Sequence, residues 1–183
     1  MVDQLRRLFL GVSLDDEVVA MLAQHLQQHH LPGRAVPPAN WHLTVRFLGM
    51  VDQLLMERLS AELDQADLGG SFEIVLGDVG AFPRPPKASV IWLAVARGSE
   101  RLSELNEIAE EASQAVRLAP EDRPFAPHLT LSRLRPELDV RADLASYRPV
   151  PLRWTASELV LYESHLGRGG AVYEPLEKFP FDS

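Results

Sequence analysis

A short motif occurs twice in this chain, and it constrains the fold more than any other feature of the sequence. The segments WHLTV and PHLTL place His42 with Thr44 and His128 with Thr130, 86 residues apart. Each segment is typical of a β-strand, where each histidine shares a face with its threonine while the apolar residues turn into a core. One His-x-Thr carries little information, but two copies predict a functional site that both strands share.

The segments around the two motifs follow similar orders, which indicates an internal duplication. Beside the two motif strands, the predicted strands are 7–12, 71–82, 90–95 and 158–162, and the predicted helices are 15–29, 52–66, 99–116 and 137–145. We therefore expect an α+β fold in which residues 1–183 form one domain. Its two pseudo-symmetric lobes would each be an antiparallel sheet with outer helices, around a central cleft.

Composition limits the class of protein. The chain has 183 residues, a formal net charge of −8 and no cysteine. The missing cysteines exclude disulfides and thiolate metal sites. The negative charge argues against a protein that coats nucleic acids, but not against one that grips a terminal phosphate with a few arginines. Because we find no signal-like or membrane-spanning stretch and no long heptad pattern, we expect a cytoplasmic monomer.

The repeated residues favour chemistry at a phosphate ester. Imidazole titrates near neutral pH, so one histidine can take a proton from a nucleophile while the other gives a proton to a leaving oxygen. Thr44 and Thr130 offer hydroxyl donors on the same face as the histidines. Under strict alternation Arg46 continues that face of the first strand, where it would add a charge-assisted contact to phosphate.

Two further candidates leave alternatives open. Strict alternation puts Arg133 on the face opposite His128, although it would turn into the cleft if the strand twisted or ended early. Phe82 belongs to a proline-rich loop, where it either fills a hydrophobic gap or stacks on a nucleobase. Trp92 is expected in the core.

The remaining histidines carry weaker signals. His25 and His29 have the i, i+4 spacing of a metal-binding pair, but a solvated helix face is the simpler interpretation. His165 is followed by glycines, so we expect it in a turn, and it has no evident partner in the sequence.

Longer segments make the chain resemble a known family. They begin at Arg7 (RLFL), His42 (HLTVRFLG), Gly80 (GAFP), Phe125 (FAPHLTLSR) and Leu161 (LYES), and they span nearly the whole chain. In these segments the chain resembles the two-histidine (2H) phosphoesterase superfamily. Within it, the chain is similar to the bacterial and archaeal RNA 2′,3′-cyclic phosphodiesterases, historically called 2′-5′ RNA ligases.

The resemblance implies hydrolysis of RNA 2′,3′-cyclic phosphate ends to 2′-phosphomonoesters, without a metal ion or a cofactor. It implies that His42 is the proton donor to the leaving O3′ and that His128 is the proton acceptor that activates water. Reversal of the same chemistry would give 2′-5′ ligation. The expected substrate-binding residues are Thr44, Thr130, Arg46, Arg133 and Phe82. The alternatives are a cyclic phosphodiesterase for a small nucleotide and a non-catalytic RNA-end-binding protein.

Overall fold

The computed structural model describes residues 5–182, so residues 1–4 and 183, the ends of the predicted domain, lie outside the described residues. The strands are β1 (Arg6–Ser13), β2 (Arg34–Ala35), β3 (His42–Val51), β4 (Phe72–Arg84), β5 (Lys87–Arg97), β6 (His128–Leu138), β7 (Arg153–Ala156), β8 (Glu158–Gly167) and β9 (Gly170–Pro180). The helices are α1 (Asp16–Gln28), a 3₁₀ turn (Pro38–Asn40), α2 (Gln53–Gln65), α3 (Ser99–Ala115) and α4 (Arg141–Ser146). Within 5–182, every helix is too short or too polar to cross a membrane.

The order of the strands mirrors itself about the centre of the sheet. The order is β7-β4-β5-β6-β3-β1-β8-β9, with β2 paired to β6 off this path, and neighbouring strands are antiparallel. A pseudo-two-fold axis therefore passes between β6 and β3, which are the two motif strands. The predicted α+β fold with two pseudo-symmetric antiparallel lobes is confirmed.

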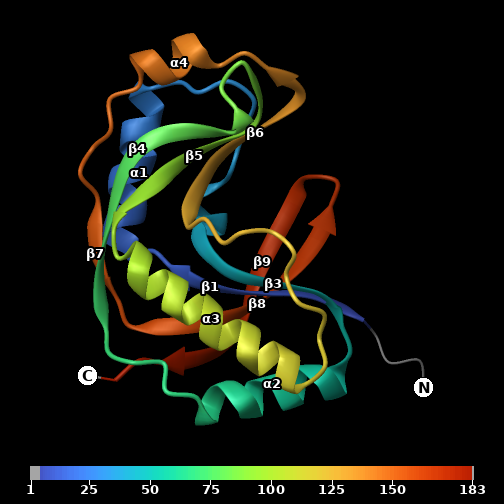
Figure 1. Cartoon of the computed structure of the whole chain (residues 1–183). Helices are drawn as coiled ribbons and strands as arrows, with labels where there is room; N and C mark the ends of the chain where they lie inside the picture. The colour runs from blue at the N-terminus through green and yellow to red at the C-terminus, as the bar shows by residue number, and fades with distance from the viewer. Residues whose placement is uncertain (1–4, 183) are drawn as a thin grey trace.

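The two lobes are joined where the motif strands meet. β3 and β6 pair only at Leu43 and Leu129, whereas each motif strand pairs along most of its length with the neighbour in its own lobe. This contact makes one continuous sheet, so the expectation of two separate sheets is wrong in that detail. On either side of the contact the strands diverge, and this divergence keeps the lobes distinct (Figure 1).

The pairing registers identify the equivalent residues of the repeat. Thr44 in β3 pairs with Gly11 in β1, and Thr130 in β6 pairs with Trp92 in β5. β1 is therefore equivalent to β5. On their outer sides, β8 is likewise equivalent to β4.

Two of the helices cross from one lobe to the other. α3 follows β5 but packs on β3, where Asn106 Nδ2 donates a hydrogen bond of 2.8 Å to the Val45 carbonyl. α1 follows β1 but lies behind β4 and β5 (Figure 1). The apolar stripes of these helices, such as Leu22 of α1 and Leu102 of α3, are fully buried in a hydrophobic core to which both lobes contribute. The lobes therefore share their packing.

Two segments differ from the predicted elements. A helix was expected from residue 137, but Leu138 still pairs with Ala88 of β5, so the chain stays extended and α4 begins at Arg141. The strand predicted over 158–162 continues to Gly167 and returns as β9, forming what we call the β8–β9 hairpin. In both segments, pairing with a neighbouring strand keeps the chain extended over more residues than the sequence pattern predicted.

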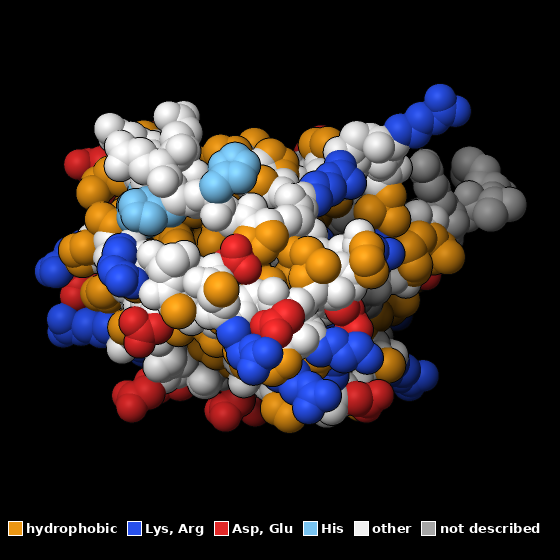
Figure 2. Space-filling view, turned by 90° about the horizontal axis from the view of Figure 1, so that it is seen from above, with side chains coloured by type: hydrophobic (Ala, Val, Ile, Leu, Met, Phe, Trp, Pro, Cys, Tyr) orange, Lys and Arg blue, Asp and Glu red, His pale blue; other side chains and the backbone are white. Residues whose placement is uncertain are grey.

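The surface seen from above mixes acidic, basic and hydrophobic side chains (Figure 2). Basic side chains on this face stand among acidic ones, so a phosphate backbone would meet charges of both signs there.

Candidate active site

His42 is fixed at the start of β3 by bonds at both ring nitrogens. Its Nδ1 lies 2.8 Å from the carbonyl oxygen of Asn40, and its Nε2 lies 2.8 Å from Thr44 Oγ1. A carbonyl oxygen can only accept, so Nδ1 carries the proton of the neutral ring. The Thr44 hydroxyl then donates to Nε2, which is held ready to receive or give a proton on the shared face.

His128 has the same backbone hydrogen bond in the second lobe. Its Nδ1 lies 2.6 Å from the carbonyl oxygen of Ala126, which again leaves Nε2 as the unprotonated nitrogen of the neutral ring. Thr130 follows two residues later in the same strand, at the position equivalent to Thr44. The structure thus gives both motif histidines the same tautomer.

Both imidazoles are neutral at pH 7 in the free protein. Burial lowers the pKa of His42 to about 4; its hydrogen bond to Asn40 opposes this, and the charges of Arg133 and His128 lower the pKa further. Burial also lowers the pKa of His128, with the bond to Ala126 opposing and Arg133 adding to the effect. The two histidines and Arg133 are therefore close enough to interact electrostatically.

A β-bulge in β3 moves Arg46 off the face of His42. Thr44 pairs with Gly11 and Arg46 pairs with Leu10, so Val45 is an extra residue opposite two consecutive residues of β1. A bulge shifts the alternation of side chains by one. Val45 and Arg46 are consequently both buried, and the expectation that Arg46 lies beside His42 is wrong.

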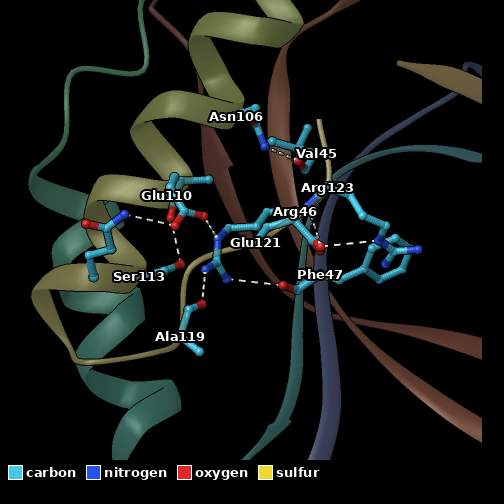
Figure 3. Close-up of polar contacts among 11 residues, drawn as sticks. Val45, Arg46, Phe47, Asn106, Glu110, Ser113, Ala119, Glu121 and Arg123 are labelled. Atoms are coloured by element: carbon cyan, nitrogen blue, oxygen red, sulfur yellow. Dashed lines mark hydrogen bonds and ion pairs between the residues drawn. The ribbon is translucent and has the colours of Figure 1, made fainter. Parts of the chain in front are cut away.

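Arg46 joins β3 to α3 and to the loop that precedes the second motif (Figure 3). Its Nε pairs with the carboxylate of Glu110, one terminal nitrogen donates to the Ala119 carbonyl at 2.7 Å, and the other donates to the Phe47 carbonyl at 3.1 Å. The Arg46 side chain is 1% exposed. In this structure its guanidinium is occupied by protein groups on the helix side of the sheet.

A bulge at the equivalent place in β6 turns Arg133 onto the face of its histidine, whereas the bulge in β3 turned Arg46 away. Thr130 pairs with Trp92 and Ser132 with Ile91, which returns Arg133 to the face of His128. Arg133 is exposed, and its charge acts on both histidines. The open question of its orientation is thus answered by the bulge.

Phe47, which the sequence reasoning missed, occupies in β3 the position that Arg133 occupies in β6. It is 49% exposed, and its ring centroid lies 6.2 Å from that of Phe9, which in turn lies 4.7 Å from His42. The sequence did contain a signal for this equivalence, because Phe47 and Arg133 each lie five residues after the histidine of their own motif.

Aromatic side chains pack against each histidine. Phe82 makes an edge contact with His128 at 5.0 Å between centroids and packs on Trp92 at 4.8 Å. Phe82 lies in β4 and not in the predicted loop, and Trp92 lies on the histidine face and not in the core, because both residues belong to the paired β4–β5 hairpin. Gly80 permits this arrangement, since a Cβ there would stand 2.2 Å from the Trp92 ring.

His165 lies in β8 and has partners that the sequence did not indicate. Its Nε2 is 2.8 Å from Glu174 and 3.8 Å from Glu163, and one ligand atom of each of these residues lies within 4.8 Å of the others. This is the one His/carboxylate group of metal-ligand spacing found within residues 5–182. Glu163 already pairs with Arg6, and alternation places the group on the hairpin face opposite Tyr162.

His25 and His29 do not form the solvated face expected of them. Their rings stack at 4.1 Å, and Tyr147 makes an edge contact with His25 at 5.3 Å. Burial is the main cause of a lowered pKa at His25.

Comparisons with known proteins agree with the resemblance seen in the sequence. The family model described as the 2′-5′ RNA ligase superfamily matches residues 14–168. An RNA 2′,3′-cyclic phosphodiesterase of Thermus thermophilus is 36% identical, covering 94% of this chain and 89% of that protein. One of Escherichia coli is 29% identical, covering 95% and 96%. The crystal structure of E. coli LigT complexed with 3′-AMP matches with a TM-score of 0.82 at 26% identity, covering 98% of this chain and 100% of that one. The chain therefore belongs to the 2′-5′ RNA ligase superfamily.

Proposed function

We propose that this protein is a cyclic phosphodiesterase that opens 2′,3′-cyclic phosphate ends of RNA to 2′-phosphomonoesters. The observation that carries the proposal is the pair of histidines in equivalent strands, each with its Nδ1 proton held by a carbonyl, which leaves Nε2 as the unprotonated nitrogen that can take part in proton transfer. The names of the relatives support the substrate class, and the 3′-AMP held by the E. coli protein supports a nucleotide with a phosphate on its ribose.

In the proposed reaction His128 Nε2 removes a proton from water while the water oxygen attacks phosphorus. The P–O3′ bond breaks, and protonated His42 gives its Nε2 proton to O3′. The assignment of the two roles follows the family resemblance. Because His42 is neutral in the free protein, the negative charge of the bound substrate must raise the pKa of His42 enough for it to carry this proton. After the reaction His128 returns its proton to solvent.

Charge on the phosphate oxygens would be stabilised by three side chains. The Thr44 hydroxyl contacts His42, Thr130 lies two residues after His128 in the same strand, and Arg133 supplies a positive charge on that face. Phosphoryl transfer depends mainly on such positioning and electrostatic stabilisation. Arg46 is not part of the proposed substrate contacts.

The proposal has three further parts. All the assigned roles belong to imidazole, hydroxyl and guanidinium groups, so the reaction should proceed without a metal ion. The exposed ring of Phe47 and the partly buried ring of Phe82 both offer apolar surface on which nucleobases could stack. This supports an RNA substrate over a small nucleotide. We also propose that the protein acts as a monomer in the cytoplasm.

The test uses a short RNA ending in a 2′,3′-cyclic phosphate, incubated with chelator, with the product phosphate located by 3′-end digestion and mass spectrometry. A 2′-phosphate should form, and His42→Ala and His128→Ala should each lower the rate by roughly 10²–10⁴-fold. His30→Ala, at an exposed position after α1, is the matched histidine control and should keep full activity.

Several results would contradict the proposal. An untouched cyclic end, or full activity in both folded histidine variants, would exclude the mechanism. A 3′-phosphate product would exclude the proposed leaving group. Activity that disappears with chelator and returns with a divalent ion would exclude the metal-free reaction, and a clear preference for mononucleotide cyclic phosphates would exclude RNA as the substrate.

A further inference from the structure

The tip of the β8–β9 hairpin is tied to the chain just before His42. β8 pairs with β1 only from Val160 to Glu163, and beyond that point the two strands of the hairpin pair with each other. Asn40 Nδ2 donates a hydrogen bond of 2.6 Å to the Ala171 carbonyl, and an Arg34 guanidinium nitrogen donates to the Gly169 carbonyl. The Asn40 bond holds the tip against the lobe that contains His42, and the Arg34 bond links the tip to β2, which pairs with β6 of the other lobe.

Asn40 serves two partners at once. Its side chain, in a residue only 9% exposed, binds the hairpin, while its own carbonyl accepts the Nδ1 proton of His42 at 2.8 Å. A displacement of Asn40 would therefore change both the position of the hairpin and the bond that orients the histidine.

The hairpin in turn supplies much of the surroundings of His42. Tyr173 makes an edge contact with the His42 ring at 5.1 Å, and Tyr162 lies 6.1 Å from it. Tyr162 also stacks on Phe9 at 5.0 Å, and Phe9 covers His42. The hairpin thus helps to exclude water from this histidine.

Within the described residues, the second lobe has no counterpart of the Asn40 bond. The residue equivalent to Asn40 is Ala126, which offers the same carbonyl to His128 but has no side chain that could bind a hairpin. Two histidines with equivalent backbone bonds therefore have different surroundings, and Asn40 is the side chain that links the backbone bond of His42 to the hairpin.

We propose that Asn40 is a positioning residue that couples the β8–β9 hairpin to His42 and thereby makes the two pseudo-equivalent histidines inequivalent. The proposal concerns catalysis only insofar as the proposed phosphodiesterase function holds. The titratable groups that face His42 are Arg133 and His128 from β6 and Tyr162 and Tyr173 from the hairpin. None of these is altered by a change at Asn40.

The test replaces the donor in two ways. Asn40→Ala removes the side chain, and Asn40→Leu keeps its approximate size but has neither a donor for the Ala171 carbonyl nor a charge. Asn106→Ala is the matched control, because Asn106 also donates from its amide to a strand carbonyl, that of Val45 in β3, but lies on the α3 side, away from the hairpin. Histidine titrations by NMR and amide exchange are measured on each free protein, with thermal unfolding to confirm folding.

Both Asn40 variants should raise the pKa of His42 toward the ordinary value of 6.5, because its ring becomes more hydrated, and should leave His128 nearly unchanged. Loss of one hydrogen bond should speed amide exchange over residues 164–173 by about fivefold to tenfold. On the cyclic-phosphate substrate kcat should fall about 10–100-fold with little change in KM. Asn106→Ala should show none of these effects.

An unchanged His42 titration and unchanged hairpin exchange in folded Asn40 variants would overturn the coupling. So would equal shifts of both histidines, or the same shift in Asn106→Ala. The titration and exchange measurements require no turnover, so they remain decisive even if the protein fails to open a cyclic phosphate, a result that would refute the proposed function alone.

Discussion

Replacement of Arg46 by methionine separates a structural role from substrate binding. Arg46→Met deletes a charge whose side chain is 1% exposed and leaves the Glu110 carboxylate, which is 22% exposed, without its partner. Breaking a buried ion pair from one side costs about 3–5 kcal/mol, and the exposure of Glu110 favours the lower end. At roughly 2–4 °C per kcal/mol for a chain of this size, the melting temperature should fall by about 6–12 °C. Urea unfolding followed by circular dichroism measures the free energy directly.

The same variant should keep kcat/KM within about threefold, because Arg46 lies on the helix side of β3. The hydrogen bond from Arg46 is the main cause of the lowered pKa of Glu110. A carboxylate whose pKa is lower in the folded state stabilises the fold above its unfolded pKa, here 4.5, and loses this contribution as the pH falls through the folded value. The stability difference between wild type and variant should therefore shrink below pH 4.5. Unchanged stability together with a tenfold loss of kcat/KM would refute this reasoning and return Arg46 to the substrate.

Three further predictions concern the histidine face. Gly80→Ala should displace the Trp92 ring, since the new Cβ would lie 2.2 Å from it, and lower kcat by disturbing His128; unchanged tryptophan fluorescence and kcat would contradict this. Arg133→Gln should lower kcat/KM by about 10–150-fold, which corresponds to the loss of a charged hydrogen bond of about 1.5–3 kcal/mol. Arg133→Lys should recover only part of the lost kcat/KM. Full activity in the glutamine variant would argue against a contact between Arg133 and the phosphate. The pH profile of kcat/KM should be bell-shaped, with its lower limb at about pH 4 and its upper limb below pH 6.5. The reason is that burial lowers the pKa of both His42 and His128, and the reaction needs one histidine charged while the other is neutral. An upper limb above pH 7 would show that the two pKa values are not lowered in this way.

Local patterns were sufficient for most of the secondary structure and for the paired histidines. The apolar stripe of α3 and the alternation at the start of each motif strand depend only on the geometry of a helix or a strand, which the chain carries within a few residues. The shared face of His42 and Thr44 therefore followed from their spacing. The same reasoning placed Arg46 wrongly, because the bulge that turns it away exists only in the pairing between β3 and β1.

Strand pairing also decided the orientation of Arg133, the exposure of Phe47 and the place of Phe82 in β4. By itself the sequence determined which groups can transfer protons and that two copies of them exist. The tertiary structure decided which side chains share their surface and why the copies differ, as Asn40 and its hairpin illustrate. The physical reason is that burial and electrostatic interaction depend on the distances between groups in space, and segments more than 80 residues apart in the sequence set those distances here.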